Sequence, residues 1–213
     1  MQAKTVGVLG TGDVGKVLAA GFKKHGYDVM IGSRAGNKVA EWSAANGIPE
    51  GTMQQAAAHG EIVVLAVGGG VASDAVQAVN DQLAGKVVID ATNPIGGPPV
   101  DGVLQFFTGP NDSLMERLQA QAPAARFVKA FSCVGNAWMV NPSFPGGPPT
   151  MFICGDDADA KATVRRVLDQ FGWETEDMGG SKSARAIEPL CQLWCLPGFM
   201  KNQWTHAFKL LKL

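Results

Sequence analysis

The hydrophobic pattern of the chain alternates between short apolar runs and longer amphipathic segments. The apolar runs are rich in β-branched residues, as is typical of strands that are buried on both faces of a parallel sheet. They lie at residues 5–9, 28–31, 61–67, 86–90, 126–131, 150–154 and 173–178. The pattern therefore predicts a central sheet whose strands lie deep inside the protein.

Segments with helical spacing of apolar residues separate these runs. They begin with Val14, Val17, Leu18 and Phe22 on one side of a helix, and continue at residues 37–45, 53–58, 71–83, 112–122 and 158–171. Strands that alternate with helices of this length form right-handed βαβ units, which bind ligands at the carboxyl ends of their strands. We therefore predict an α/β fold with a doubly wound, mostly parallel sheet.

Two later segments depart from the alternation. Residues 95–110 are rich in glycine and proline and also carry two phenylalanines, so they form either a lid over the cleft or an irregular loop that tucks its apolar residues onto the core. From residue 181 a long amphipathic helical stretch begins, which we expect to be interrupted at Pro197-Gly198. These boundaries predict a nucleotide-binding domain over residues 1–180 and a helical appendage over residues 181–213.

The appendage carries more aromatic surface than a solvated tail would. Trp194, Phe199, Trp204 and Phe208 need a partner surface, because the helices of the sheet domain already cover both of its faces. A symmetric contact between two copies is the commonest way to provide such a surface. We expect a homodimer through this segment, which also closes the substrate cleft.

Composition and charge narrow the class of protein. The formal net charge of −1 and the lack of long basic runs argue against a nucleic-acid partner. No stretch approaches the ~18 consecutive apolar residues of a membrane span, so we expect a cytoplasmic protein without a membrane partner. The four cysteines have no metal-ligand or disulfide spacing, which indicates free thiols and no metal site.

The sharpest motif is the glycine loop that follows the first apolar run. Its glycines suit a tight turn, close approach of a pyrophosphate and close packing of helix on strand, and we expect Asp13 to be the N-cap of that helix. The phosphates would lie on the helix N-terminus, where unpaired N–H groups and the helix dipole favour an anion. The predicted loop residues are Gly10, Thr11, Gly12, Asp13, Val14 and Gly15.

The end of the second strand indicates which nucleotide is bound. A cofactor with a free ribose 2′-hydroxyl requires an acidic residue about twenty positions after the glycines, and none stands there. Ser33 and Arg34 occupy this position, and Lys38 follows one helical turn later. A hydroxyl and a guanidinium suit a 2′-phosphate, so the sequence predicts NADP(H) rather than NAD(H).

Candidates for the chemical step are weak. Gly68 and Asn93 follow buried strands and should line the cleft, and Asn93 and Lys129 are the weak catalytic candidates. The histidines and the tyrosine give no clear proton donor, because His25, Tyr27 and His59 lie at the wrong end of the sheet and His206 lies on the appendage. This favours a flavin-type acceptor, to which hydride can pass directly.

With these segments in place, the chain resembles the NADP oxidoreductases that depend on 8-hydroxy-5-deazaflavin and the reductase domain of membrane ferric reductases. The resemblance rests on motifs along nearly the whole chain: Gly10-Thr-Gly12-Asp-Val-Gly15-Lys, Ile31-Gly-Ser33-Arg34, Leu65-Ala-Val67, Asp90-Ala-Thr-Asn-Pro94, Val128-Lys-Ala-Phe131, Cys154-Gly-Asp-Asp157 and Ser183-Ala-Arg185-Ala-Ile-Glu188-Pro-Leu190.

The resemblance implies that the glycine loop holds the pyrophosphate, that Ser33 and Arg34 hold the 2′-phosphate, and that Val67 and Asn93 lie near the nicotinamide. The chain departs from the family pattern at two places near the second substrate. Three glycines at residues 68–70 replace a proline, and Ser132-Cys133 replaces Asn-Thr.

Three functions follow from these observations. The leading one is an NADP(H)-dependent oxidoreductase that passes hydride to a flavin or deazaflavin co-substrate or to a small carbonyl or imine acceptor. The second is an imine or keto-acid reductase like the pyrroline-carboxylate reductases, in which Thr92, Asn93 and Lys129 position the substrate. The third is an NADP(H)-binding redox sensor that turns nothing over.

Overall fold

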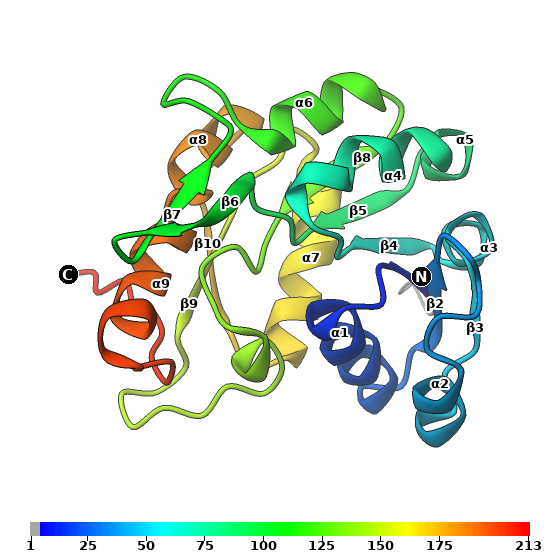
Figure 1. Ribbon diagram of the computed structural model, residues 1–213, viewed down its shortest axis with the longest axis horizontal. Coiled ribbons are helices and arrows are strands. Elements are labelled where there is room, and N and C mark those ends of the chain that lie inside the picture. Colours follow the sequence, from blue (N-terminus) through cyan, green and yellow to red (C-terminus); the bar gives the residue numbers. More distant parts are fainter. Residues whose placement is uncertain (1–4) are drawn as a thin grey trace.

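The computed structural model describes residues 5–213. Six strands form one sheet in the order β3-β2-β1-β4-β5-β8, and every neighbouring pair is parallel. The strands are β1 (Thr5–Leu9), β2 (Asp28–Ser33), β3 (Glu50–Thr52), β4 (Ile62–Leu65), β5 (Val87–Asp90) and β8 (Arg126–Lys129). The strand order reverses between β1 and β4, which confirms the prediction of a doubly wound parallel sheet (Figure 1).

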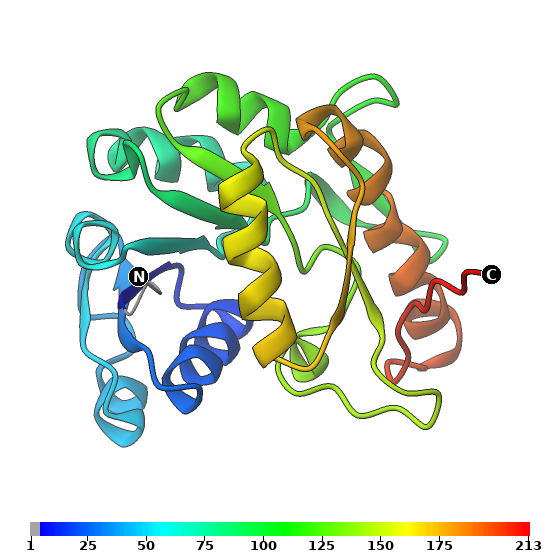
Figure 2. The same ribbon diagram turned by 180° about the vertical axis from the view of Figure 1, so that it is seen from behind.

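Helices cover both faces of this sheet. Successive residues of β4 alternate between two apolar clusters, with Val64 in one and Val63 and Leu65 in the other. The first cluster includes α1 (Asp13–Lys24) and α7 (Ala158–Gln170), and α7 lies in front of the sheet in Figure 2. The second cluster is formed by α3 (Met53–His59), α4 (Ala72–Ala78), the short α5 (Asn80–Leu83) and α6 (Leu114–Gln121).

The edge of the sheet beyond β1 differs from the sequence prediction. β2 continues to Ser33, and the unpredicted β3 pairs with it although its Glu-Gly-Thr sequence has no apolar run. Thr52 then begins α3 with a capping box: its hydroxyl accepts from the backbone N–H of Gln55 at 3.2 Å, and Gln55 Oε1 accepts from the N–H of Thr52 at 2.8 Å. The preceding helix, α2 (Ala40–Asn46), begins later than the predicted residue 37.

Two of the predicted strands form a separate small sheet. β9 (Thr150–Ile153) and β10 (Glu174–Asp177) pair in parallel, and α7 connects them. Trp173, immediately before β10, is buried, and its indole N–H donates to the carbonyl oxygen of Met139 at 2.9 Å. This small sheet lies beside the end of β8, where Lys129 forms an isolated antiparallel β-bridge with Cys154.

Residues 95–110 do not form an irregular loop. They contain an antiparallel hairpin of β6 (Ile95–Val100) and β7 (Val103–Phe106). Asp101 and Gly102 both have positive φ, 49° and 79°, as the two central residues of a type I′ turn do. Leu104 is buried, whereas Val100 and Val103 are exposed, so the hairpin places only part of its apolar surface on the body of the protein.

The C-terminal part contains two helices and an irregular tail. α8 (Ala184–Ile187) is followed by α9 (Leu190–Lys201), which passes through Pro197 and is capped by Asn202, a residue with left-handed backbone conformation. The predicted interruption at Pro197-Gly198 is therefore wrong, because loss of one N–H donor does not stop this helix. The tail then runs along β9, where Thr150 donates its N–H to Phe208 O at 2.9 Å.

Short 3-10 turns occupy η1 (Gly69–Val71), η2 (Asn136–Trp138) and η3 (Ser181–Ser183). None of the helices in residues 5–213 has both the length and the hydropathy that a membrane span requires.

Candidate functional site

The loop between β1 and α1 gives its three glycines different surroundings. Gly10 has a φ of 120°, and a Cβ atom there would lie 2.2 Å from the carbonyl oxygen of Ala66. A Cβ atom at Gly15 would lie 2.0 Å from the carbonyl oxygen of Gly10. At Gly12, in contrast, a Cβ atom would meet nothing within 4 Å. The open space at Gly12 fits a phosphate group that approaches the backbone closely.

The N-terminus of α1 supplies the donors for such a phosphate. Gly12 is the N-cap, with φ −75° and ψ −177°, and no side chain caps the helix. The prediction that Asp13 is the N-cap is wrong, because the extended backbone that a cap requires falls on Gly12 and Asp13 is already helical. The N–H groups of Asp13 and Val14 belong to the first turn, where no intrahelical carbonyl precedes them, so they can donate to an anion. Thr11, just before the cap, is partly exposed.

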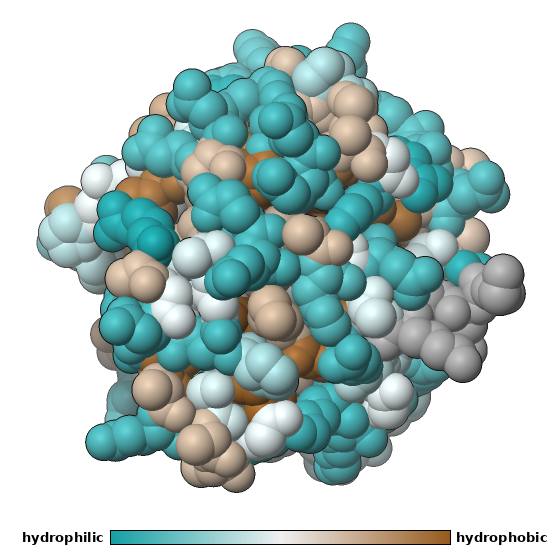
Figure 3. Space-filling model, turned by 90° about the vertical axis from the view of Figure 1, so that its right-hand side faces the viewer, coloured by the Kyte–Doolittle hydropathy of each residue, from teal (hydrophilic) through white to brown (hydrophobic). Residues whose placement is uncertain are grey.

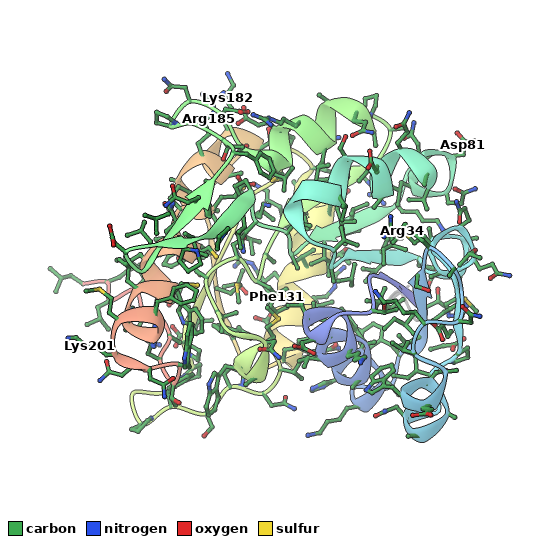
Figure 4. All side chains as sticks on the ribbon, viewed as in Figure 1. Arg34, Asp81, Phe131, Lys182, Arg185 and Lys201 are labelled. Carbon is green, nitrogen blue, oxygen red and sulfur yellow. The ribbon has the colours of Figure 1, made fainter. Side chains whose placement is uncertain are left out.

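The predicted 2′-phosphate site lies at the end of β2. The side chains of Arg34 and Lys38 are exposed, and Arg34 is labelled beside the blue and cyan elements in Figure 4. Ser33 is 4% exposed, and its hydroxyl accepts from the N–H of Gly36 at 3.0 Å. Hydrophilic side chains cover most of the surrounding face, which carries α2 and α3 (Figure 3). The two cations therefore lie on an accessible polar surface, whereas the hydroxyl of Ser33 helps to order the loop.

Glu50 is a residue of this region that the sequence reasoning missed. Its Oε1 atom accepts from the backbone N–H of Lys38 at 2.6 Å and lies 3.4 Å from Ser33 Oγ, and the carboxylate also accepts from the N–H of Val39 at 3.0 Å. Glu50 lies on the unpredicted β3, far beyond the spacing at which an acid that binds the ribose is expected. The carboxylate is engaged in holding the loop that carries Arg34 and Lys38.

A cleft of about 430 Å³ lies at the carboxyl ends of the strands, between the glycine loop and α9. The sequence-predicted residues that it brings together are Gly12, Asp13, Val14, Val67, Gly68 and Asn93. The remaining wall consists of Ala66, Ala91, Phe131, Ser132, Val134, Asn136, Met139, Cys191, Trp194 and Cys195. Sequence analysis connects the C-terminal segment and Ser132 with the site, whereas it does not anticipate Val134, Asn136 and Met139. Figure 4 places Phe131 near the centre of the molecule.

Lys129 does not line this cleft. Its side chain is fully buried, and its Nζ atom lies 2.7 Å from Asp90 Oδ2 and 2.9 Å from Glu188 Oε1. The same ammonium donates to the carbonyl oxygen of Thr92 at 2.9 Å. Burial pushes the pKa of Lys129 down, but the charges and hydrogen bonds of the two carboxylates together raise it above its ordinary value. Lys129 is therefore a paired cation beneath the site and does not reach a substrate.

The buried group of Asp90, Lys129 and Glu188 joins four elements. Asp90 Oδ1 accepts from the N–H and the hydroxyl of Thr92, at 2.9 and 2.6 Å. Glu188 accepts from the N–H groups of Leu114 and Met115 at the start of α6, at 2.9 and 3.0 Å. Because Asp90 is opposite Lys129 in the register of β5 and β8, part of this contact follows from topology, whereas Glu188, the C-cap residue of α8, was missed.

This arrangement fixes the backbone on either side of Asn93. Asn93 donates through Nδ2 to the carbonyl oxygen of Ser132 at 3.2 Å. Among the described residues, Asn93 Oδ1 and Ser132 Oγ are buried atoms without a hydrogen-bond partner, and both residues line the cleft. Phe131, next to Ser132, has a φ of 63°, which is rare for a residue with a side chain. Asn93 Oδ1 and Ser132 Oγ could therefore form hydrogen bonds with polar groups of a ligand in the cleft.

Trp194 forms the wall that α9 contributes. It is 6% exposed, and its ring packs so closely that a Cβ atom at Gly135 would lie 2.6 Å from it. Its indole N–H donates to His206 O at 2.9 Å, and the ring of His206 stacks on it at 4.8 Å between centroids. Trp204 lies 5.8 Å from Trp194, also between centroids. Part of the aromatic surface for which we predicted a second subunit is therefore buried within the chain.

The other histidines and the tyrosine have partners away from the cleft. His25 Nε2 lies 3.1 Å from Asn141 Oδ1, and His59 Nε2 lies 3.2 Å from the carbonyl oxygen of Asp28. The hydroxyl of Tyr27 donates to Gln170 at 2.7 Å.

A glycine loop at the switch point of a doubly wound sheet, with two exposed cations past the second strand, is typical of Rossmann-type NADP-dependent oxidoreductases. The sequence profile of the family described as NADP oxidoreductase, coenzyme F420-dependent, matches residues 5–94. The F420-dependent NADP reductase of Methanothermobacter thermautotrophicus is 30% identical over 211 residues, 91% of this chain and 88% of that protein. The chain belongs to this family of NADP oxidoreductases, which confirms the resemblance found in the sequence.

Two further relatives extend the comparison. The crystal structure of a protein from Arthrobacter sp. FB24, provisionally described as an F420-dependent NADP reductase, has a TM-score of 0.90 and 30% identity, and the match covers 99% of this chain and 100% of that one. The metalloreductase STEAP3 of Rattus norvegicus is 30% identical over 189 residues, 89% of this chain but 36% of that protein. The chain therefore spans about a third of the length of that metalloreductase.

Proposed function

We propose that this protein transfers hydride directly between NADP(H) and a deazaflavin, coenzyme F420, in the cleft between the glycine loop and α9. The observation that carries the proposal is the composition of the cleft wall. Beyond the glycine loop it includes the large apolar side chains of Phe131, Met139 and Trp194, together with the unpaired polar atoms of Asn93 and Ser132. Such a wall suits a flat ring system with a polar edge.

Different residues of this chain would bind the different parts of the nucleotide. The N–H groups of Asp13 and Val14 would hold the pyrophosphate, and Arg34 and Lys38 would hold the 2′-phosphate. Bound NADP(H) supplies the hydride at its nicotinamide ring. Val67 and Asn93 lie at the carboxyl ends of β4 and β5, where they border the position of that ring at the strand-order switch.

Reduction of a carbonyl or imine also requires a proton, and the site offers little to supply one. Among residues 5–213, the cleft lining includes no histidine, tyrosine or lysine. Lys129 is held by two carboxylates and a carbonyl oxygen. A deazaflavin accepts hydride directly once the two rings are held face to face, so orientation and exclusion of water are the main tasks of the cleft.

The test is NADPH oxidation by the purified protein with coenzyme F420, FMN and a cyclic imine as separate acceptors. We expect F420 to be reduced with the highest kcat/KM, and Asn93→Ala to lower this value while the exposed control Asn80→Ala leaves it unchanged. Preferential reduction of the imine would establish the pyrroline-carboxylate-reductase type of activity instead. Tight NADPH binding with no turnover of any acceptor would favour the redox sensor.

We also propose that the protein is a homodimer through its C-terminal segment. Exposed apolar side chains of the hairpin and α9 support this, with Val100 57%, Leu193 53% and Met200 67% exposed. The two elements adjoin, since a Cβ atom at Gly102 would lie 3.1 Å from Met200 Cγ. Sedimentation should give a dimer that Leu193→Glu with Met200→Glu converts to a monomer, whereas a monomeric parent protein would overturn the proposal.

The division into residues 1–180 and 181–213 is proposed as a functional one, with the second part closing the cleft through Trp194. We further propose a cytoplasmic location. The four free cysteines are consistent with a reducing compartment. Cell fractionation with an antibody to the protein tests the location, and recovery in a periplasmic or extracellular fraction would contradict it.

A further inference from the structure

Two cysteines in the wall of the cleft have no part in the hydride transfer described above. Cys191 and Cys195 lie one turn apart on α9, on either side of Trp194 in that turn, and both line the cleft. Cys191 is buried and Cys195 is partly exposed. Residues at this spacing share one face of a helix, so the two sulfur atoms are neighbours.

The two thiols differ in character because of their mutual contact. A hydrogen bond from the thiol of Cys191 lowers the pKa of Cys195 below its ordinary value, and the same bond, together with burial, raises the pKa of Cys191. Cys195 is thus the more reactive sulfur and also the more accessible one. Its neighbour one helical turn away, Cys191, is a buried thiol whose raised pKa keeps it protonated.

The other two cysteines provide an internal comparison. Cys133 and Cys154 are 3% and 0% exposed. Burial raises the pKa of each to about 12, so both remain protonated and inert. An oxidant that reaches the cleft therefore meets Cys195 first.

We propose that Cys191 and Cys195 form a redox-modified dithiol site that hydroperoxides oxidise, closing the cleft to the electron acceptor. In the first step the Cys195 thiolate attacks the peroxide, takes up one oxygen atom as a sulfenic acid and releases an alcohol or water after a proton is added. In the second step the thiol of Cys191 attacks the sulfenic sulfur, a disulfide forms and water leaves. Two thiols and one hydroperoxide thus give one disulfide, one alcohol or water molecule and one further water.

A disulfide at this position would be easily reduced. Residues four apart on a helix have Cβ atoms about 5–6 Å apart, whereas a disulfide needs about 3.5–4.5 Å. The bridge therefore has to tighten one turn of α9, and strained disulfides have higher reduction potentials and serve as labile switches. Pro197 adds adaptability, because it offers no N–H to the carbonyl oxygen of Leu193.

Tightening this turn would act on the cleft through Trp194. Trp194 lies between the two cysteines in the sequence, and its indole ring packs so closely on Gly135 that a Cβ atom there would not fit. Movement of this ring changes the wall that the acceptor would contact. The glycine loop and Arg34 lie on the opposite side of the site, so NADP(H) binding should persist. This consequence rests on the proposed function, whereas the oxidation itself does not.

The experiment treats the full-length protein with a small excess of hydrogen peroxide, then blocks remaining thiols and digests with trypsin. Residues 186–201 form one tryptic peptide that holds both Cys191 and Cys195, and residues 130–161 form another that holds Cys133 and Cys154. We expect a mass loss of two hydrogens in the first peptide only, reversed by dithiothreitol. Turnover of the acceptor should fall at the same rate, with the NADPH dissociation constant changed less than twofold.

Two variants separate the steps. Cys195→Ser should lose no further activity on peroxide treatment, and Cys191→Ser should accumulate a sulfenic acid at Cys195 that dimedone traps. The proposal is overturned if the peptide of residues 130–161 oxidises as fast, if no disulfide forms, or if the disulfide forms with turnover unchanged. A protein that reduces no acceptor before treatment refutes the proposed function, while the mass result still decides whether the dithiol site exists.

Discussion

Replacement of Lys129 by methionine tests the buried ionic group most severely. The substitution keeps the length and apolar character of the side chain but leaves Asp90 and Glu188, 0% and 1% exposed, without their cation. Breaking a buried pair by removing one partner costs about 3–5 kcal/mol. Domains of this kind have unfolding free energies of about 5–15 kcal/mol, so we expect Lys129→Met to remove a large fraction of the total.

The assay is urea unfolding followed by the fluorescence of the five tryptophans. The matched control is Lys212→Met, which breaks an exposed pair with Glu176 in which the lysine side chain is 62% exposed. Such a surface pair contributes about 0–1 kcal/mol. If the two variants lose equal stability, or if Lys129→Met unfolds within about 1 kcal/mol of the parent protein, the ionic group does not hold the site as described.

The same group predicts the effect of alkaline pH. The pKa of Lys129 is raised in the folded protein, so its stabilisation is complete below the ordinary lysine pKa of 10.5 and is lost as the pH rises through the folded-state value. Urea midpoints of the parent protein should therefore fall in this alkaline range. In Lys129→Met the fall should be smaller, and an identical pH profile for both proteins would contradict the assignment.

Four further predictions concern the nucleotide site, the acceptor part of the cleft and one contact between helices. Arg34→Ala should weaken NADPH binding by about 1.5–3 kcal/mol and leave NADH binding nearly unchanged. If NADPH and NADH binding weaken equally, Arg34 does not bind the 2′-phosphate. Gly12→Val has space in the free protein but obstructs the pyrophosphate, so calorimetry should show a loss of NADPH affinity of roughly tenfold or more in a normally folded variant. Ser132→Ala should lower kcat/KM for the acceptor with little change in urea midpoint, because its hydroxyl has no partner among the described residues. A hydrogen bond from Arg185 is the main cause that lowers the pKa of Glu116, so Glu116→Gln should remove a stabilisation that is present above pH 4.5 and lost as the pH falls below it, as acid titration of the urea midpoint would show.

The parts of the fold that the sequence predicts well are those in which neighbouring residues decide the structure. β1 and the glycine loop follow from a short apolar run and three glycines. At two of them, Gly10 and Gly15, a side chain would collide with a backbone carbonyl oxygen. The hairpin was missed although Asp101-Gly102 is a strong turn signal, because Pro98 and Pro99 argue against a strand. An edge hairpin tolerates them, since its outer groups need no partner in the sheet.

The parts that could not be predicted depend on contacts between distant segments. Glu188 meets Lys129 and the start of α6 only when α8 has docked, and no spacing in the sequence encodes that contact. The sequence predicts that the segment with Trp194 closes the cleft, but not that this ring packs against Gly135, which leaves room for it. The sequence thus predicts the nucleotide half of the site, whereas the acceptor half depends on tertiary packing.

The most direct test of the account is the fate of the transferred hydrogen. NADPH that carries deuterium on the reactive face of its nicotinamide C4 is mixed with the protein and coenzyme F420, and the reduced product is examined by mass spectrometry and NMR. If hydride passes directly between the two rings, the deuterium is retained at the ring carbon of the reduced deazaflavin even though the reaction takes place in ordinary water. Deuterium released to the solvent, or NADPH oxidation without labelled product, would contradict the proposed reaction.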